Sequence, residues 1–597
     1  MKKSLLFVSL LTAISVYGQT SSQPTTAWAN ILTGIPGQDQ SSSIATYGKE
    51  AVYWMLTDGS KTSDRDVIYG NDELYQGALY DGTSSNKNLT LLKTDSNGNK
   101  QWCVYSSWGD FSPNEGGVAV KSNGDVVFSC TVRHTDGYLD KPITIVDAKG
   151  KSTEINWDVE KRWLELIVGT VSSDGELLWV RTYGIDNTLA STGAFLANSL
   201  TNSSVAVDDE GNIYVGGNYR SAMTFPKTDN TTVTLQPKNI ENWKGDSQST
   251  VGSLYLVKLD SDGYYLNHLA ETGSDIAASY IQNLEWKDGN LYVCGYLKGN
   301  ENATVNIAGV DLTPTQYFCP LIGCLNGALE ASWLKCLPGD AVGGTSTVQN
   351  VGLTVEDDSV WYAGMFNGKI SDSSDNSKYV ASASKNPREG FIIELSAMDG
   401  SWKNGVTSKQ GFSDAALTGY SKVIVPSNEL SNLYVYGYNM TNGVFLRCYD
   451  RSTLDAKVDD SWYIITSAGM VTSQCIDYVP EIGAVYTTSR SNKAFLPING
   501  QETEAVTGFV NLLARFNMPE GFTTGINEVN NEKNERISIN VAKGVIIAEN
   551  KSDVNINIMI FDLTGRCVCS NSIGAGEKQI INLESGIYIV NGRKIML

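Results

Sequence analysis

The sequence has little of what most catalytic sites require. It contains only two histidines among 597 residues, and the motifs HExxH, GxSxG and GxxxxGK[ST] do not occur. Their absence removes the usual signatures of zinc peptidases, serine hydrolases and P-loop nucleotide-binding proteins. The ten cysteines include no CxxC pair and do not have the spacing of a small disulfide scaffold. They are therefore compatible with disulfide bridges and with buried, reduced thiols.

Positive charge and long apolar runs are also scarce. The 45 Lys and Arg are outnumbered by 65 Asp and Glu, so the net charge is −20. An acidic surface repels phosphate, which argues against a nucleic-acid partner. The one marked apolar run, Leu5–Val16, follows Lys2 and Lys3 and precedes the small residue Gly18. Residues 1–18 are therefore expected to be a secretory signal peptide, with no transmembrane segment after its cleavage.

Two hairpins between Ser204 and Gly273 form the clearest pattern in the chain. SVAVDDEGNIYVGGNY (204–219) has the order strand, acidic glycine turn and strand, and LYLVKLDSDGYYLNHLAETG (254–273) repeats it. Glycine accepts the positive φ of a tight turn, and apolar alternation directs one face of each hairpin inward. Together they predict a four-stranded antiparallel unit of about 70 residues, which is typical of a propeller blade.

The same unit recurs along most of the chain. Outer hairpins end in tryptophan, as in SSDGELLW (172–179), and His268 is interpreted as the replacement for this tryptophan in the third unit. The recurrence predicts about seven blades between Tyr47 and Phe516. The segment AWANILTG (27–34) is expected to complete the last blade and remove two exposed sheet edges. The sequence thus predicts an all-β fold, with a propeller over residues 19–521.

This repeat resembles the SBBP-type propeller repeats of secreted bacterial proteins. Their pattern is a tryptophan strand, a glycine, an inner strand, Asp-x-x-Gly-Asn-x-Tyr-Val and an outer strand with Asp-Gly. The match covers roughly residues 27–518 and is strongest between Asp208 and Gly295. The resemblance implies a fold and export, and it implies no reaction.

The C-terminal part has a different character. Residues 522–534 are polar and predict a linker, whereas residues 535–597 predict several short strands of a small Ig-like β-sandwich. FDLTGR (561–566), LESGIYIV (583–590) and the terminal RKIML resemble the C-terminal sorting domain of the type IX secretion system of Bacteroidetes. That resemblance implies the type IX machinery as a partner and a secreted or cell-surface protein. A generic Ig-like module, with periplasmic or other surface retention, is the alternative.

Long insertions are expected at one end of the propeller, opposite the tight Asp-Gly turns. Loops on a rigid scaffold commonly carry binding sites, and exposed aromatic rings can stack on sugars or anchor proteins. Aromatic residues that cap small clusters within their own loops are the alternative interpretation. The insertions are Thr57–Asn88, Arg133–Arg162, Arg220–Thr250, Leu297–Thr315 and Asn367–Glu389, and the candidate ligand-binding residues within them are Tyr75, His134, Tyr138, Trp157 and Trp243.

These patterns favour a non-enzymatic, exported binding module for a glycan or a protein. One alternative is a carbohydrate-active lyase or hydrolase that uses acidic, Tyr or His groups, and another is a structural envelope protein. No catalytic residue, metal ligand or cofactor is predicted. Calcium is kept only as the alternative interpretation of turns such as DSDG at Asp260–Gly263, because the remaining EF-hand ligands are absent.

Overall fold

The structure of the protein is a computed structural model of the whole chain. It divides into two compact units, residues 1–522 and 523–597. The residues that it describes are 23–33, 40–60, 66–76, 86–106, 110–133, 143–155, 164–184, 200–238, 252–273, 278–299, 303–315, 319–340, 349–382, 389–410, 412, 418–426, 431–439, 441–467, 471–503 and 510–519 in the first unit, and 537–542, 545–551, 556–562, 567–583, 587–590 and 593–596 in the second.

The first unit is a seven-bladed β-propeller, as the repeat predicts. Each blade is an antiparallel group of four strands, named below in order from the innermost to the outermost. The first blade contains β2 (Gln40–Tyr47), β3 (Ala51–Ser60), β6 (Asn86–Asp95) and β7 (Lys100–Ser106), and the second contains β8 (Asp110–Val120), β9 (Val126–Arg133), β12 (Leu164–Val171) and β13 (Leu177–Gly184). The third contains β14 (Leu200–Val207), β15 (Ile213–Tyr219), β18 (Ser253–Leu259) and β19 (Tyr265–His268), the fourth contains β21 (Ala278–Lys287), β22 (Asn290–Lys298), β25 (Cys319–Asn326) and β26 (Ala331–Cys336), and the fifth contains β28 (Gln349–Glu356), β29 (Ser359–Phe366), β32 (Glu389–Ser396) and β33 (Trp402–Thr407). The sixth contains β34 (Thr418–Ile424), β35 (Asn432–Asn439), β36 (Gly443–Asp450) and β37 (Ala456–Ser467), and the last contains β38 (Val471–Val479), β39 (Ala484–Ser491), β41 (Val510–Asn517) and β1 (Thr25–Thr33).

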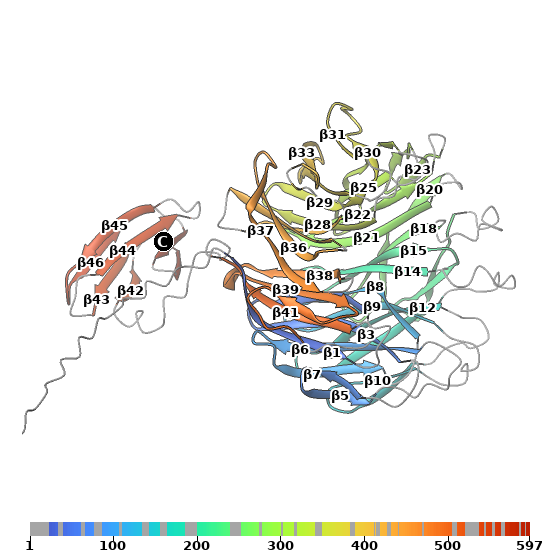
Figure 1. Cartoon of the computed structure of the whole chain (residues 1–597), viewed down its shortest axis with the longest axis horizontal. Helices are drawn as coiled ribbons and strands as arrows, with labels where there is room; N and C mark the ends of the chain where they lie inside the picture. Colours follow the sequence, from blue (N-terminus) through green and yellow to red (C-terminus); the bar gives the residue numbers. More distant parts are fainter. Residues whose placement is uncertain are drawn as a thin grey trace, which may run out of the picture. The chain divides into compact units, whose positions relative to one another are not determined.

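The N-terminal strand closes the ring. Strand β1 pairs antiparallel with β41, from Thr25 opposite Asn517 to Leu32 opposite Asn511, so blue and orange strands lie side by side in Figure 1. The innermost strands β2, β8, β14, β21, β28, β34 and β38 contact one another in a closed circuit. The predicted closure by an N-terminal strand is confirmed, and it removes the two free edges of the last blade.

Aspartates shape the tight turns that the sequence repeats. The Asp208 carboxylate accepts hydrogen bonds from the backbone N–H groups of Glu210 and Asn212 at 3.1 and 2.8 Å, and Gly211 takes a φ of +85°. Asp95 and Asp260 bind their own turns in the same way. Such a turn needs no metal, because the carboxylate caps its own backbone.

At four blade junctions, a tryptophan of an outer strand contacts the outer turn of the following blade. The Trp179 indole N–H donates to the Ser261 carbonyl in the outer turn of the following blade, at 3.0 Å. A Cβ on Gly263 of that turn would lie 2.6 Å from the Trp179 ring, so only glycine fits there. The four such pairs are Trp28 with Gly98, Trp102 with Gly175, Trp179 with Gly263 and Trp333 with Gly400.

Two blades use asparagine in place of this tryptophan. Asn267 donates to the Ala328 carbonyl at 2.7 Å, and Asn404 donates to the Ser452 carbonyl at 3.3 Å. The turns that receive them carry Leu329 and Leu454, with φ of +65° and +58°, where the other turns have glycine. Without a tryptophan ring against it, the turn position accepts a side chain. His268 therefore does not replace the tryptophan, because Asn267 occupies that position.

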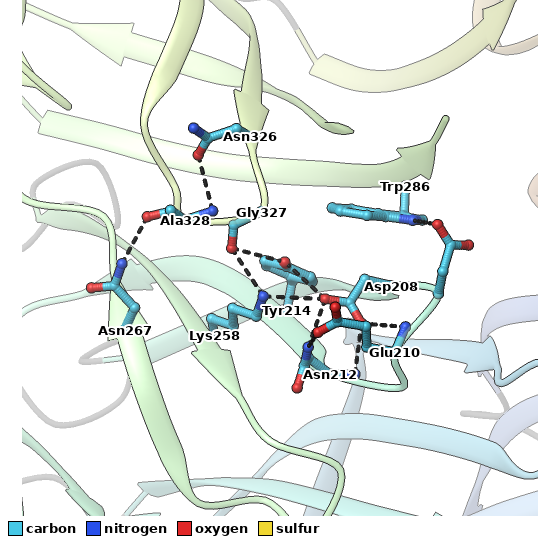
Figure 2. A network of polar contacts seen from close by, with 11 residues as sticks. Asp208, Glu210, Asn212, Tyr214, Lys258, Asn267, Trp286, Asn326, Gly327 and Ala328 are labelled. Atoms are coloured by element: carbon cyan, nitrogen blue, oxygen red, sulfur yellow. Dashed lines mark hydrogen bonds and ion pairs between the residues drawn. The ribbon is translucent and has the colours of Figure 1, made fainter. Parts of the chain in front are cut away.

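A polar network joins the third blade to the fourth, as Figure 2 shows. The Lys258 ammonium lies 3.2 Å from Asp208 Oδ2 and donates to the Gly327 carbonyl at 2.9 Å. The Tyr214 hydroxyl reaches the same two acceptors, and the Trp286 ring stacks on Tyr214 with centroids 5.6 Å apart. Burial raises the pKa of Asp208, but hydrogen bonds from Asn212 and Lys258 more than offset this, so its pKa is lowered.

The described strands of the insertions lie on the outer rim of the ring. Strand β4 (Asp66–Tyr69) of the first blade's insertion pairs with β1 of the last blade, and β10 (Ile143–Val146) of the second blade's insertion pairs with β7 of the first. Each added strand protects an outer edge that would otherwise be exposed. The other strands of the insertions and their partners are β5 (Asp72–Gln76), β11 (Ser152–Ile155), β16 (Met223–Pro226), β17 (Thr232–Leu235), β20 (Glu271–Gly273), β23 (Val305–Ile307), β24 (Val310–Leu312), β27 (Gly339–Asp340), β30 (Gly368–Ser371), β31 (Tyr379–Ser382) and β40 (Phe495–Pro497).

The second unit is a small β-sandwich with its own apolar core. Isoleucines from both sheets meet there, including Ile546, Ile558 and Ile560. Its sheets are β42 (Ile537–Ala542), β43 (Val545–Asn550) and β46 (Lys578–Asn582), and β45 (Cys567–Ile573), β44 (Ile556–Asp562), β47 (Ile587–Val590) and β48 (Arg593–Met596). Within the described part of the chain, no helix has the length and apolar character needed to cross a membrane.

Replacing a turn glycine tests the tryptophan contact. Gly263 and Gly211 have nearly equal φ, +84° and +85°, but a Cβ at Gly211 would meet nothing within 4 Å. Both changes to alanine cost about 1 kcal/mol for the positive φ. Gly263→Ala should cost about 1 to 3 kcal/mol more, because the new methyl group overlaps the Trp179 ring. Denaturant unfolding of both variants measures this difference, and equal losses would contradict the contact.

Candidate functional site

A cavity of about 170 Å³ lies on the inner side of four neighbouring blades. Its walls come from the ends of the innermost strands β21, β28, β34 and β38, next to the turns that lead to the second strands. It therefore opens on the end of the propeller that carries the tight turns. The volume has room for about five or six waters, or for one small polar group such as a sugar ring, and it is below the usual range for larger ligands.

Five charged side chains line this cavity. Three are carboxylates, on Glu285, Glu356 and Asp477, and two are ammonium groups, on Lys287 and Lys422. Lys287 Nζ lies 3.3 Å from Glu356 Oε2, whereas Lys422 Nζ lies 3.9 Å from Asp477 Oδ1. The longer separation exceeds a direct hydrogen bond. The Lys422 ammonium can therefore donate to a group that enters the cavity.

Burial and neighbouring charges tune two of these groups. Desolvation raises the pKa of Glu285, and the nearby Lys422 ammonium offsets it only in part. Burial also lowers the pKa of Lys287, but the Glu356 carboxylate more than compensates, so the pKa of Lys287 is raised. The cavity thus contains a carboxyl group that resists ionisation, Glu285, and a lysine whose charged form is stabilised, Lys287.

Two of the carboxylates also tie neighbouring blades together. Glu285 Oε1 accepts the Val355 N–H at 3.1 Å, and Asp477 Oδ2 accepts both the N–H and the hydroxyl of Thr46, at 2.9 and 2.8 Å. These bonds give a partner to backbone N–H groups at the free edges of the innermost strands. They fix Glu285 Oε1 and Asp477 Oδ2, and Asp477 Oδ1 accepts the Tyr478 N–H at 3.0 Å, so both oxygens of Asp477 accept hydrogen bonds.

Of the five sequence-predicted residues, the structure describes Tyr75, which does not line this cavity. Tyr75 belongs to β5 on the outer rim, where it is 5% exposed and stacks on Tyr105 with ring centroids 4.1 Å apart. It thus lacks the exposed ring face on which its predicted role rests. His134, Tyr138, Trp157 and Trp243 lie outside the described residues, and their role stays a prediction.

The cavity residues were missed because they adjoin the tight turns, where no site was expected. Their sequence signal is a charged residue at the end of several innermost strands, as in LEWKDGN (284–290), LTVEDDS (353–359) and IDYVPE (476–481). One charged residue before a turn is common on any surface. Only the ring, which brings these strand ends around one axis, turns the pattern into a cluster.

The arrangement is suited to hydrogen bonding with a polyhydroxylated or otherwise polar ligand. Carboxylate oxygens accept hydroxyl protons and lysines donate to oxygens, while Tyr478 adds an aromatic side chain to the lining. Within the described residues, no group of three or more His, Cys, Asp and Glu side chains has a geometry that could hold a metal ion.

Comparisons with known proteins show likeness in fold alone. No family model and no curated protein matches the sequence. A quinohemoprotein alcohol dehydrogenase of Comamonas testosteroni is 11% identical, with a TM-score of 0.35 over 84% of this chain and 78% of its own. A periplasmic gluconolactonase of Pseudomonas aeruginosa is 10% identical, with a TM-score of 0.34 over 82% and 99%. A protein of unknown function from Dyadobacter fermentans is 11% identical, with a TM-score of 0.34 over 68% and 94%.

Glu285 should lower the stability of the protein at neutral pH. Its folded pKa is raised, so the folded state binds the proton more tightly and loses stability as pH rises through the interval above the unfolded pKa, about 4.3. Glu285→Gln should therefore unfold at a higher temperature than the parent at pH 7, and the difference should vanish near pH 4. Melting curves across this range provide the measurement. A glutamine variant that is less stable at pH 7 would show that Glu285 is mainly a structural acceptor.

Proposed function

We propose that the protein is an exported, non-enzymatic binding module that holds one polar residue of a glycan in the cavity between the innermost strands. The observation that carries this proposal is the convergence of three carboxylates and two lysines from four blades on one small cavity. Such a set offers acceptors and donors in several directions at once, which suits a ring of hydroxyl groups.

A carbohydrate-active hydrolase is the second candidate, and the same cavity supports it. Glycosidases use one carboxyl group that holds its proton and a second that is ionised. Burial raises the pKa of Glu285, and Asp477 and Glu356 lie in the same cavity. Binding is placed first because Glu285 and Asp477 also bond to the backbone of neighbouring blades, which limits their freedom to act on a substrate.

The purified chain should retain intact glycan when it is mixed with members of a polysaccharide panel and separated on a sizing column. Lys422→Ala should weaken binding about 10- to 100-fold, since it removes a charged hydrogen-bond donor worth about 1.5 to 3 kcal/mol. Lys149→Ala is the matched control, because Lys149 is 53% exposed and pairs with Asp174 away from the cavity.

Three other results of this experiment would each indicate a different function or a different site. Shortened glycan would replace the binding role by the hydrolase, and Glu285→Gln should then abolish cleavage. Glycan binding that Lys422→Ala leaves unchanged would move the site away from the cavity, toward the long insertions. No retained glycan at all would contradict a glycan ligand and favour a protein partner.

We also infer that residues 535–597 direct the protein to the cell surface or the medium through the type IX machinery. Support comes from the order of the FDLTGR, LESGIYIV and RKIML motifs, together with the separate core of this unit. In a host that has the machinery, deletion of residues 535–597 should leave the propeller folded and trapped inside the outer membrane. Cell fractionation measures this, and normal surface appearance of the truncated chain would refute it.

A further inference from the structure

Two cysteines of the fourth blade lie side by side at the end of the blade away from its tight turns. Cys319 begins β25 and Cys336 ends β26. Leu321 lies opposite Cys336, and the Leu337 N–H donates to the Pro320 carbonyl at 2.9 Å. Residues two apart on a strand share a face. Cys319 and Cys336 are therefore diagonal neighbours on one face of the sheet.

The two sulfur atoms are in contact within an apolar environment. Both side chains are buried in the same hydrophobic cluster. Both are free thiols in the structure, and the Cys336 S–H donates a hydrogen bond to the Cys319 sulfur, which is the largest cause of the raised pKa of Cys336. Cα atoms of diagonal neighbours on antiparallel strands lie about 7–8 Å apart, so a bridge requires these two strand ends to move slightly closer together.

The opposite face of the same blade provides an internal contrast. Cys294 lies opposite Ile322, so it is also a diagonal neighbour of Cys324. The Cys324 thiol, however, interacts with Tyr292 and Ser332. A diagonal position alone does not bring two sulfur atoms together in this blade, and the contact is a feature of Cys319 and Cys336.

A covalent link at this place would join the segments that enter β25 and leave β26. Thr315 Oγ1 lies 3.7 Å from Cys319 Sγ, and it exchanges hydrogen bonds with the backbone of Gly339 at 3.1 Å. A bridge would add a covalent link to these weak contacts, between the end of the Leu297–Thr315 insertion and the segment that follows β26. It would also restrain the outermost strand of the blade.

We propose that Cys319 and Cys336 form a disulfide in the exported protein. The reaction is thiol–disulfide exchange with a disulfide oxidant of the extracytoplasmic space: two S–H bonds break, one S–S bond forms, and the two electrons and two protons reduce the oxidant to two thiols. The proposal rests on the proposed export, because cytoplasmic thiols are kept reduced. The chemistry itself can be tested on the purified chain, whatever its location.

The test is peptide mapping of the full chain after it has been reduced in denaturant and refolded with glutathione disulfide, so that the oxidant reaches both thiols before they are buried. Trypsin releases residues 299–335, which hold Cys319 and Cys324, and residues 336–369, which hold Cys336 as their only cysteine. Mass spectrometry without reductant should find these two peptides linked, and a reductant should separate them. Cys319→Ser should abolish the linked peptide, whereas the matched control Cys324→Ser should leave it unchanged.

Reduction should also lower the melting temperature of the parent chain by a few degrees and leave that of Cys319→Ser unchanged, because a bridge restrains the unfolded chain. Peptides that remain unlinked after oxidation would overturn the proposal, as would glutathione adducts on the individual cysteines. A link that persists in Cys319→Ser and disappears in Cys324→Ser would show that Cys324 forms the bridge to Cys336, which would also overturn the proposal. If the bridge forms on the purified chain while cell fractionation finds the protein in the cytoplasm, the export proposal fails and the chemistry stands.

Discussion

The contact of an outer-strand side chain with the outer turn of the following blade is the constraint that spaces the blades, and it is made by tryptophan at four junctions and by asparagine at two. A four-stranded blade cannot bury its apolar faces alone, and the hydrophobic clusters accordingly contain residues of neighbouring blades, such as Tyr214 of β15 and Leu291 of β22. The indole N–H satisfies a turn carbonyl, while its ring covers a glycine that has no room for a side chain. One side chain thus sets both the distance and the register between two blades.

Much of this architecture follows from local sequence chemistry, because turns and strand alternation are short-range. The Asp-Gly turns, the blade repeat and the closure by residues 27–34 could be predicted, and the structure confirms the propeller. The prediction that His268 replaces the outer tryptophan was wrong. The spacing indicates Asn267 instead, because it follows Gly263 by four residues, as Trp179 follows Gly175. The outward packing of the insertions was not predictable, since pairing of β4 with β1 joins distant parts of the chain.

The candidate site could not be predicted from the sequence for a related reason. Glu285, Asp477 and Lys422 lie on three strands separated by more than 50 residues in sequence, and only closure of the ring brings them around one axis. Glu285 and Asp477 have two roles, because each accepts a backbone N–H at an inner strand edge and each also lines the cavity.

The most direct test of the account is a double-mutant cycle at one blade junction. Trp333 and Gly400 form a tryptophan–glycine pair, and the φ of Gly400, +67°, is close to that of Leu329 at a junction with asparagine. Trp333→Asn and Gly400→Leu should each destabilise the protein. If the pairing governs the junction, the double variant should be more stable than the sum of the single losses predicts, by about 1 to 3 kcal/mol. Additive losses would show that the tryptophan and the turn act independently, which would contradict the account.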